Sequence, residues 1–171
     1  MKWLVFAWLL AAGMGVSYSV IAERQRKVRF LKEMEHSLGK LAYYMYQWRM
    51  PIKEAICRMV QEEKGEFQRY YVEVRDALEE RQAEDFGKLW QEKSKNLLEH
   101  AARVCDEGQM LWTEAFVNLP MDVEELNRRL LFRINDMKVY REALEKKYKG
   151  EQKLVFAMGI FVSTFFCLIF W

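Results

Sequence analysis

The side chains that could do chemistry in this chain are two histidines and the lysines of two Gly-Lys pairs. His36 and His100 have no recognisable partner pattern, and the chain contains no Gly-x-Ser-x-Gly turn that would present a nucleophile. A phosphate-binding loop requires a glycine five residues before the Gly-Lys pair and a hydroxyl residue after it, and Gly39-Lys40 and Gly87-Lys88 have neither. We therefore predict no catalytic residue, no cofactor and no enzymatic activity.

The spacing of the possible metal ligands is also unfavourable. Cys57, Cys105 and Cys167 are odd in number, far apart and without Cys-x-x-Cys spacing, which argues against a zinc site and a disulfide framework. Acidic pairs such as Glu62-Glu63 and Glu79-Glu80 are adjacent, so on a helix their side chains diverge by about 100 degrees. We predict no metal site.

Four neighbouring aromatic residues, Tyr43, Tyr44, Tyr46 and Trp48, could stack unpaired bases in a binder of single-stranded nucleic acid. The charge does not support that function, because 27 basic and 25 acidic residues give a net charge of +2 without a concentrated basic excess. The spacing instead places Trp48 on the apolar side of a helix, with the tyrosines half-buried around the helix end. We predict no binding of nucleic acid.

The two ends of the chain are apolar runs, uncharged apart from Lys2, with cations on their inner sides. Residues 1–22 and 154–171 are each long enough for a transmembrane helix, since about 20 residues span a hydrocarbon core. Lysine and arginine are retained on the cytoplasmic side, which places residues 23–153 in the cytoplasm. An alternative is a cleaved signal peptide ending at Val20-Ile21-Ala22. The cations expected to set the orientation are Arg24, Arg26, Lys27, Arg29, Lys147, Lys149 and Lys153.

Small residues recur every four positions in both apolar runs, which lets helix backbones approach closely inside a bilayer. We predict that these stripes face each other or face partner proteins. The first stripe is Ala7, Ala11, Gly15 and Ser19, and the second is Gly159, Ser163 and Cys167.

Between the two runs, apolar residues recur at helical spacing and proline occurs only at positions 51 and 120. We therefore expect an all-α fold, a single cytoplasmic bundle of about six helices flanked by the two transmembrane helices. The first helix carries an apolar seam from Leu31 to Trp48 and turns sharply at 49–50, and Pro51 begins the second.

The later helix boundaries follow from breakers and caps. Gly65 is expected to stop the second helix, and two further helices begin near residues 67 and 86. A fifth helical stretch is expected from Asn96 to Phe116, with Gly108 as a possible kink. The last helix is expected to start at the Asp122 capping box and to run into the terminal apolar run.

The layout and local sequence resemble the stage III sporulation protein AB family of endospore-forming bacteria. The resemblance covers the whole length and is strongest over residues 20–60. It is carried by Glu23-Arg24-Gln25-Arg26, Val28-Arg29-x-Leu31, Leu38-x-x-Leu41, Pro51-Ile52-x-Glu54-Ala55 and Gly150-Glu151-Gln152-Lys153.

The resemblance implies a bundle similar to the cytoplasmic domain of the type II secretion F protein. It also implies a place in the channel between mother cell and forespore, in the outer forespore membrane with the domain in the mother-cell cytoplasm. The implied partners are the other membrane subunits of the channel, a cytoplasmic secretion-type ATPase, the lipid bilayer and a possible second copy of the chain. The expected function is a non-enzymatic platform or adaptor, and the alternative is a membrane-anchored sensor with a ligand-binding bundle.

Overall fold

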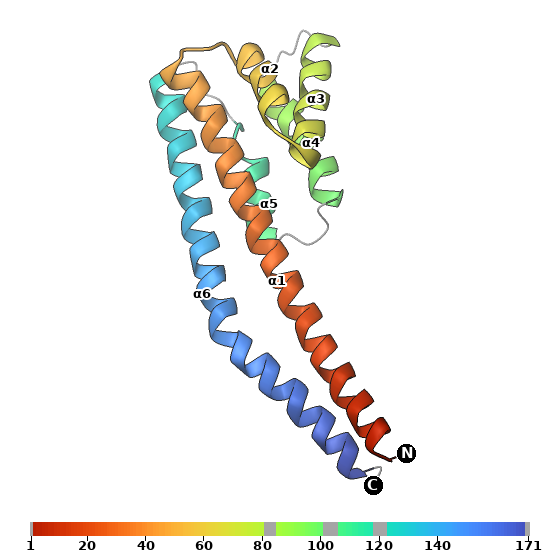
Figure 1. Ribbon diagram of the computed structural model, residues 1–171. Coiled ribbons are helices and arrows are strands. Elements are labelled where there is room, and N and C mark those ends of the chain that lie inside the picture. The colour runs from red at the N-terminus through yellow and green to blue at the C-terminus, as the bar shows by residue number, and fades with distance from the viewer. Residues whose placement is uncertain (1, 81–84, 101–105, 118–122, 170–171) are drawn as a thin grey trace. The chain divides into compact units, whose positions relative to one another are not determined.

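The computed structural model describes residues 2–80, 85–100, 106–117 and 123–169, with the side chains of the first helix described from Met14 onward. The described residues form six helices and no strand (Figure 1), which confirms the all-α prediction. The helices are α1 (Lys2–Gln47), α2 (Ile52–Glu62), α3 (Gly65–Glu80), α4 (Phe86–His100), α5 (Asp106–Thr113) and α6 (Val123–Ile169).

The chain forms two compact units. The terminal unit contains residues 1–29 and 142–171, and the bundle unit contains residues 30–141. The predicted domain boundaries, after residue 22 and after residue 153, describe where the chain would enter the membrane and not how its helices pack. These boundaries stay a prediction.

In the bundle unit, α2 packs against α3, α3 packs against α4, and α4 packs against α5 (Figure 1). The core is aromatic: Trp90 lies with its ring centroid 5.0 Å from that of Trp112 and 4.5 Å from that of Phe116. Tyr70 stacks edge-on against Trp90 at 5.1 Å. Rings this close add about 0.5–1.5 kcal/mol per pair beyond the burial of their surface.

The second half of α1 contributes an apolar seam to the same unit. Leu31, Met34, Leu38 and Leu41 are fully buried, as the period of the sequence predicts. The prediction that Trp48 ends this seam is wrong, because its side chain is 53% exposed. The α-helix ends at Gln47, so Trp48 no longer follows the helical period.

Two predicted boundaries in the middle of the chain are wrong. Residues 96–100 continue α4 and do not begin a fifth helix, and Gly65 begins α3 with a φ angle of 65° where we expected it to stop α2. Gly108 lies inside the short helix α5. The predicted cap at Asp122 and the predicted helical positions Ala101, Val104 and Cys105 lie outside the described residues.

The terminal unit pairs the first part of α1 with the last part of α6. Ser17 Oγ lies 3.4 Å from the carbonyl oxygen of Val155, and Arg24 Nη1 lies 2.9 Å from Glu151 Oε2. Residue numbers rise along α1 while they fall along α6, so the two segments are antiparallel. This places the two apolar runs side by side.

The prediction of a long last helix is confirmed, since α6 continues through Gly150 into the apolar run. In the part of the chain that the structure describes, no helix is both long enough and apolar enough to cross a membrane. The two predicted transmembrane helices are thus unconfirmed.

Candidate interaction site at the corner between α1 and α2

The corner between α1 and α2 has a fixed backbone. Arg49 has a φ angle of 49°, a left-handed conformation that costs a residue with a side chain roughly 1 kcal/mol. The N–H of Met50 donates to the carbonyl oxygen of Tyr44 at 3.2 Å, which satisfies one of the carbonyls left free at the end of α1. Pro51 lies one residue before α2, and its carbonyl accepts from the N–H of Ala55 at 3.0 Å. The predicted turn at residues 49–50 is present.

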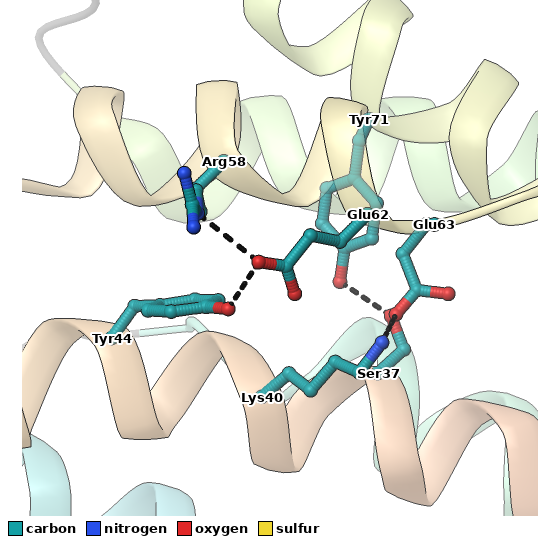
Figure 2. A network of polar contacts seen from close by, with 7 residues as sticks. All are labelled: Ser37, Lys40, Tyr44, Arg58, Glu62, Glu63 and Tyr71. Atoms are coloured by element: carbon teal, nitrogen blue, oxygen red, sulfur yellow. Dashed lines mark hydrogen bonds and ion pairs between the residues drawn. The ribbon is translucent and has the colours of Figure 1, made fainter.

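A network of polar side chains joins α1 to the end of α2 (Figure 2). The Tyr44 hydroxyl donates to Glu62 Oε1 at 2.6 Å, and Arg58 Nε donates to the same oxygen at 3.0 Å. Lys40 Nζ, one turn earlier on α1, lies 3.1 Å from Glu63 Oε1. These contacts fasten the last turn of α2 to the side of α1.

A buried pair of hydroxyls lies beside this network (Figure 2). Ser37 Oγ and Tyr71 Oη are 2.8 Å apart, and both residues are fully buried. Burial raises the pKa of Tyr71, so its hydroxyl is neutral at physiological pH. Because this bond gives each of the two buried oxygens a partner, it holds α3 against α1 at a low cost of desolvation.

The hydrogen bond between Tyr44 and Glu62 is charge-assisted. It is the main cause that raises the pKa of Tyr44, and burial adds to the rise. The same bond is the main cause that lowers the pKa of Glu62, with Arg58 and Lys40 contributing. At neutral pH Tyr44 is therefore a neutral donor and Glu62 an ionised acceptor. This protonation suits a structural clamp and not proton transfer.

An open groove of about 650 Å³ adjoins the corner, between the end of α1 and the start of α6 in the bundle unit. We call it the corner groove. Its lining includes an arginine, Arg49, and the amide side chains of Gln47 and Asn127. Most of the lining is apolar, and includes Met45, Met50, Pro51, Ile52, Leu126 and Leu130.

Exposed aromatic side chains surround the corner. Tyr46 lines the groove and is 47% exposed, while Tyr43 and Trp48 are 52% and 53% exposed. Trp48 is held in place, because its Nε1 donates to the Tyr43 hydroxyl at 3.2 Å and its ring stacks edge-on against Tyr44. Aromatic residues, methionine and arginine are the types enriched at protein interfaces. The corner groove therefore has the composition of a protein-binding surface.

The possible metal ligands do not gather into a site in the part of the chain that the structure describes. Among the described residues, no group of three or more His, Cys, Asp or Glu side chains is placed to hold a metal ion. His36 and Cys57 are exposed. The side chain of His100 and residue Cys105 lie outside the described part of the chain, as does the side chain of Cys167.

The cations predicted to orient the chain fall into two groups. Three of them are paired within the terminal unit: Arg24 with Glu151, Lys27 with Glu23 at 3.6 Å, and Lys149 with Glu145 at 2.8 Å. The other four are exposed, and these are Arg26, Arg29, Lys147 and Lys153.

The two described side-chain positions of the first small-residue stripe, Gly15 and Ser19, do not face α6. Gly15 and Ser19 are exposed, and a Cβ added at Gly15 would meet no atom within 4 Å. The buried residues on this part of α1 are Ser17 and Ile21. Gly159 is half-buried, and the side chains of Ala11 and Ser163 lie outside the described ones. The two predicted roles of the stripes, contact with each other or with partner proteins, stay a prediction.

Sequence reasoning missed the Tyr44–Glu62 clamp, because its two residues lie 18 positions apart on different helices. It also missed Gly87, where an added Cβ would collide with the carbonyl oxygen of Phe116 and lie 3.3 Å from its carbonyl carbon. For the close approach at Gly87, the only signal in the sequence is that a glycine stands at the start of a predicted helix.

Comparison with known proteins gives one result. A sequence model of the stage III sporulation protein AB family matches residues 2–171. Neither the curated proteins nor the solved structures contain a match to this chain.

Proposed function

The chain belongs to the stage III sporulation protein AB family, and from that premise we propose that it is a non-enzymatic, membrane-anchored platform of the sporulation channel. The observation that carries the proposal is the family match over almost the entire chain, including both apolar ends. In this function the bundle unit faces the mother-cell cytoplasm from the outer forespore membrane. There it docks a cytoplasmic secretion-type ATPase and meets the other membrane subunits.

Membrane anchoring is supported by the surface of the terminal unit. Large apolar side chains are exposed on both helices, for example Val16 at 67%, Tyr18 at 70% and Phe161 at 73%. A pair of helices in water would leave this area uncovered, and patches of this kind mark contact with lipid or with other proteins. We propose that residues 1–22 and 154–171 lie in the bilayer.

Docking through the corner groove is supported by its exposed aromatic residues and its fixed backbone. Trp48 and Tyr46 offer large, rigid contact area at low cost in conformational entropy. Because the left-handed Arg49 and the Tyr44–Glu62 clamp hold this corner, a partner would meet a preformed surface. We place the ATPase contact here.

Complementation of a deletion strain tests the proposal. The deletion should block sporulation after engulfment, and the wild-type gene should restore heat-resistant spores. A chain with Tyr46→Ala and Trp48→Ala should accumulate normally but restore few spores, and the ATPase should no longer co-purify after crosslinking.

The matched control is a chain with Leu131→Ala and Phe132→Ala, which removes from α6 two apolar side chains, 54% and 64% exposed, that do not line the corner groove. It should behave as wild type. Full spore yield from the deletion strain would refute the sporulation function. Equal loss of the ATPase in both double variants would refute docking through the corner.

The groove volume also suits the second function, a ligand-binding sensor, since small-molecule sites occupy roughly 300–1,000 Å³. Coupling to the membrane would then pass through Gly150 of α6. A Cβ at Gly150 meets no atom within 4 Å, so Gly150→Ala is sterically tolerated. Normal sporulation of this variant is expected for a platform, whereas a defect at normal protein level would favour the sensor.

A further inference from the structure

The two compact units carry net charges of opposite sign. The terminal unit contains nine basic and four acidic residues and has a net charge of +5. The bundle unit contains eighteen basic and twenty-one acidic residues and has a net charge of −3. The overall charge of +2 conceals this separation, which places the cationic surplus beside the apolar ends.

The acidic residues of the terminal unit are already engaged. Glu23, Glu145 and Glu151 form ion pairs within the unit, and Glu142 also has an interaction. Five exposed cations remain for which the described part of the chain provides no ion pair. They are Arg26, Arg29, Lys146, Lys147 and Lys153, and we call them the basic belt.

The contacts between the helices bring these cations into one short stretch of the helix pair. Arg24 binds Glu151, and its guanidinium lies 5.1 Å from the centre of the Tyr148 ring. In an antiparallel pair with this register, residues 26–29 of α1 lie opposite residues 146–149 of α6. Lys153 lies about one turn closer to the apolar end. The basic belt thus contains cations from both helices and lies next to the exposed apolar surface of the pair.

We propose that the basic belt binds the phosphate-bearing headgroups of anionic phospholipids in the leaflet that surrounds the helix pair. This inference rests on the membrane anchoring proposed above. The basic belt is continuous with exposed apolar side chains, such as Leu154, which is 62% exposed. We therefore expect lipid to bind there, because a lipid offers both a charged headgroup and hydrocarbon. Headgroup phosphates lie at the level where hydrocarbon ends, which is where the cations of both helices lie if the apolar runs are in the bilayer. Each lysine or arginine near an anionic surface strengthens association roughly fivefold.

The lipids in contact with the full-length chain can be measured after reconstitution into phosphatidylcholine vesicles. Trace spin-labelled phosphatidylglycerol or phosphatidylcholine reports, by electron paramagnetic resonance, the fraction of each lipid that the protein immobilises. Phosphatidylglycerol should be selected several-fold over phosphatidylcholine, and the selectivity should fall as salt is added.

Two variants with the same change in total charge show which cations cause the selectivity for phosphatidylglycerol. The belt variant carries Arg26→Gln, Arg29→Gln, Lys146→Gln, Lys147→Gln and Lys153→Gln, and it should show no selectivity. The control variant neutralises five exposed cations of the bundle unit, Lys53, Lys64, Arg69, Lys95 and Lys138, and it should keep the wild-type selectivity.

Equal immobilisation of the two lipids by the wild-type chain would overturn the inference, as would equal loss in the two variants. Vesicle flotation in alkaline carbonate separates this failure from failure of the anchoring. A chain that floats with the vesicles but shows no selectivity contradicts the basic belt alone, whereas a chain that does not float contradicts the anchoring as well.

Discussion

Trp90 and Trp112 are both fully buried in the same aromatic core, yet their indole N–H groups differ. Trp90 Nε1 donates to the carbonyl oxygen of Trp112 at 2.9 Å, whereas Trp112 Nε1 is buried with no partner at hydrogen-bond geometry among the described residues. The Tyr70 hydroxyl, which lies nearby, is bonded to Ser94 Oγ at 3.2 Å. Two residues of one type and equal burial therefore differ in what a substitution would remove.

Trp90→Phe should lower the free energy of unfolding by about 0.5–1.5 kcal/mol more than Trp112→Phe. Both changes remove a similar ring area, but only the first removes a hydrogen bond, whereas the second removes a donor that has no partner among the described residues. The Trp112 carbonyl keeps the bond from the N–H of Ala115, at 3.2 Å, in both variants. Urea unfolding of the full-length protein in detergent micelles, followed by circular dichroism, measures the difference. Equal destabilisation, or the reverse order, would contradict the assigned hydrogen bond.

Tyr44→Phe should destabilise the protein by about 1 kcal/mol at pH 7, because it removes a donor to an ionised carboxylate. The pKa of Glu62 is lowered by folding, so its contribution is present above its unfolded pKa and is lost as pH falls through the folded value. The pKa of Tyr44 is raised, so its contribution is present below its unfolded pKa and is lost as pH rises through the folded value.

The difference between wild type and the Tyr44→Phe variant should therefore be largest between roughly pH 5 and pH 10. Unfolding in urea at a series of pH values gives this profile. Tyr43→Phe is the control, since its hydroxyl is exposed and bonds only to Trp48 among the described contacts. A difference that stays constant from pH 3 to pH 7 would show that Glu62 is not the partner.

At the scale of helices, the sequence predicts the long elements well and the short ones poorly. The apolar period of α1 is sufficient to predict the first helix, and the uninterrupted helical pattern at the end of the chain is sufficient to predict the sixth. The boundary between the fourth and fifth helices is wrong in the prediction, which begins a helix at Asn96, whereas α4 continues to His100. Ser94, just before that boundary, is buried and bonded to Tyr70. A polar residue that is satisfied by a distant partner looks the same in a sequence as one that faces solvent.

The candidate site was predictable only in part, for the same reason. Pro51 and the turn before it follow from local backbone chemistry, so the corner could be located. The clamp between Tyr44 and Glu62 and the exposure of Trp48 depend on how α2 packs against α1, and one sequence does not determine that packing.

The packing of α4 gives a prediction with an internal control. Gly87→Ala should destabilise the protein by about 1–3 kcal/mol, because its Cβ would collide with the backbone of Phe116. Gly39→Ala, in the middle of α1 with no atom within 4 Å of the added Cβ, should stabilise it by about 0.5–1 kcal/mol. Midpoints of urea unfolding should move in opposite directions. A shift in the same direction for both would contradict the close approach at Gly87.

At the scale of the whole molecule, two units with different surfaces perform two tasks in this account. The terminal unit is basic and exposes apolar side chains, which suits contact with a bilayer. The bundle unit is acidic, has an aromatic core and offers a preformed corner, which suits a soluble partner. In this proposal, both ends of the chain insert in the membrane and leave the bundle unit on its cytoplasmic side.

Labelling of single cysteines in intact cells tests that claim most directly. Cys57 is exposed on the bundle unit, so a chain with Cys105→Ser and Cys167→Ser leaves one native probe there. A second chain with all three cysteines replaced by serine and Trp171→Cys places the probe at the end of the second apolar run. Both are made in non-sporulating cells, where the far side of the membrane is the medium, and treated with a membrane-impermeant maleimide. We expect Cys57 to react with the maleimide only after lysis, and the cysteine at position 171 to react in intact cells. Reaction of Cys57 in intact cells, or protection of the terminal cysteine until lysis, would contradict it.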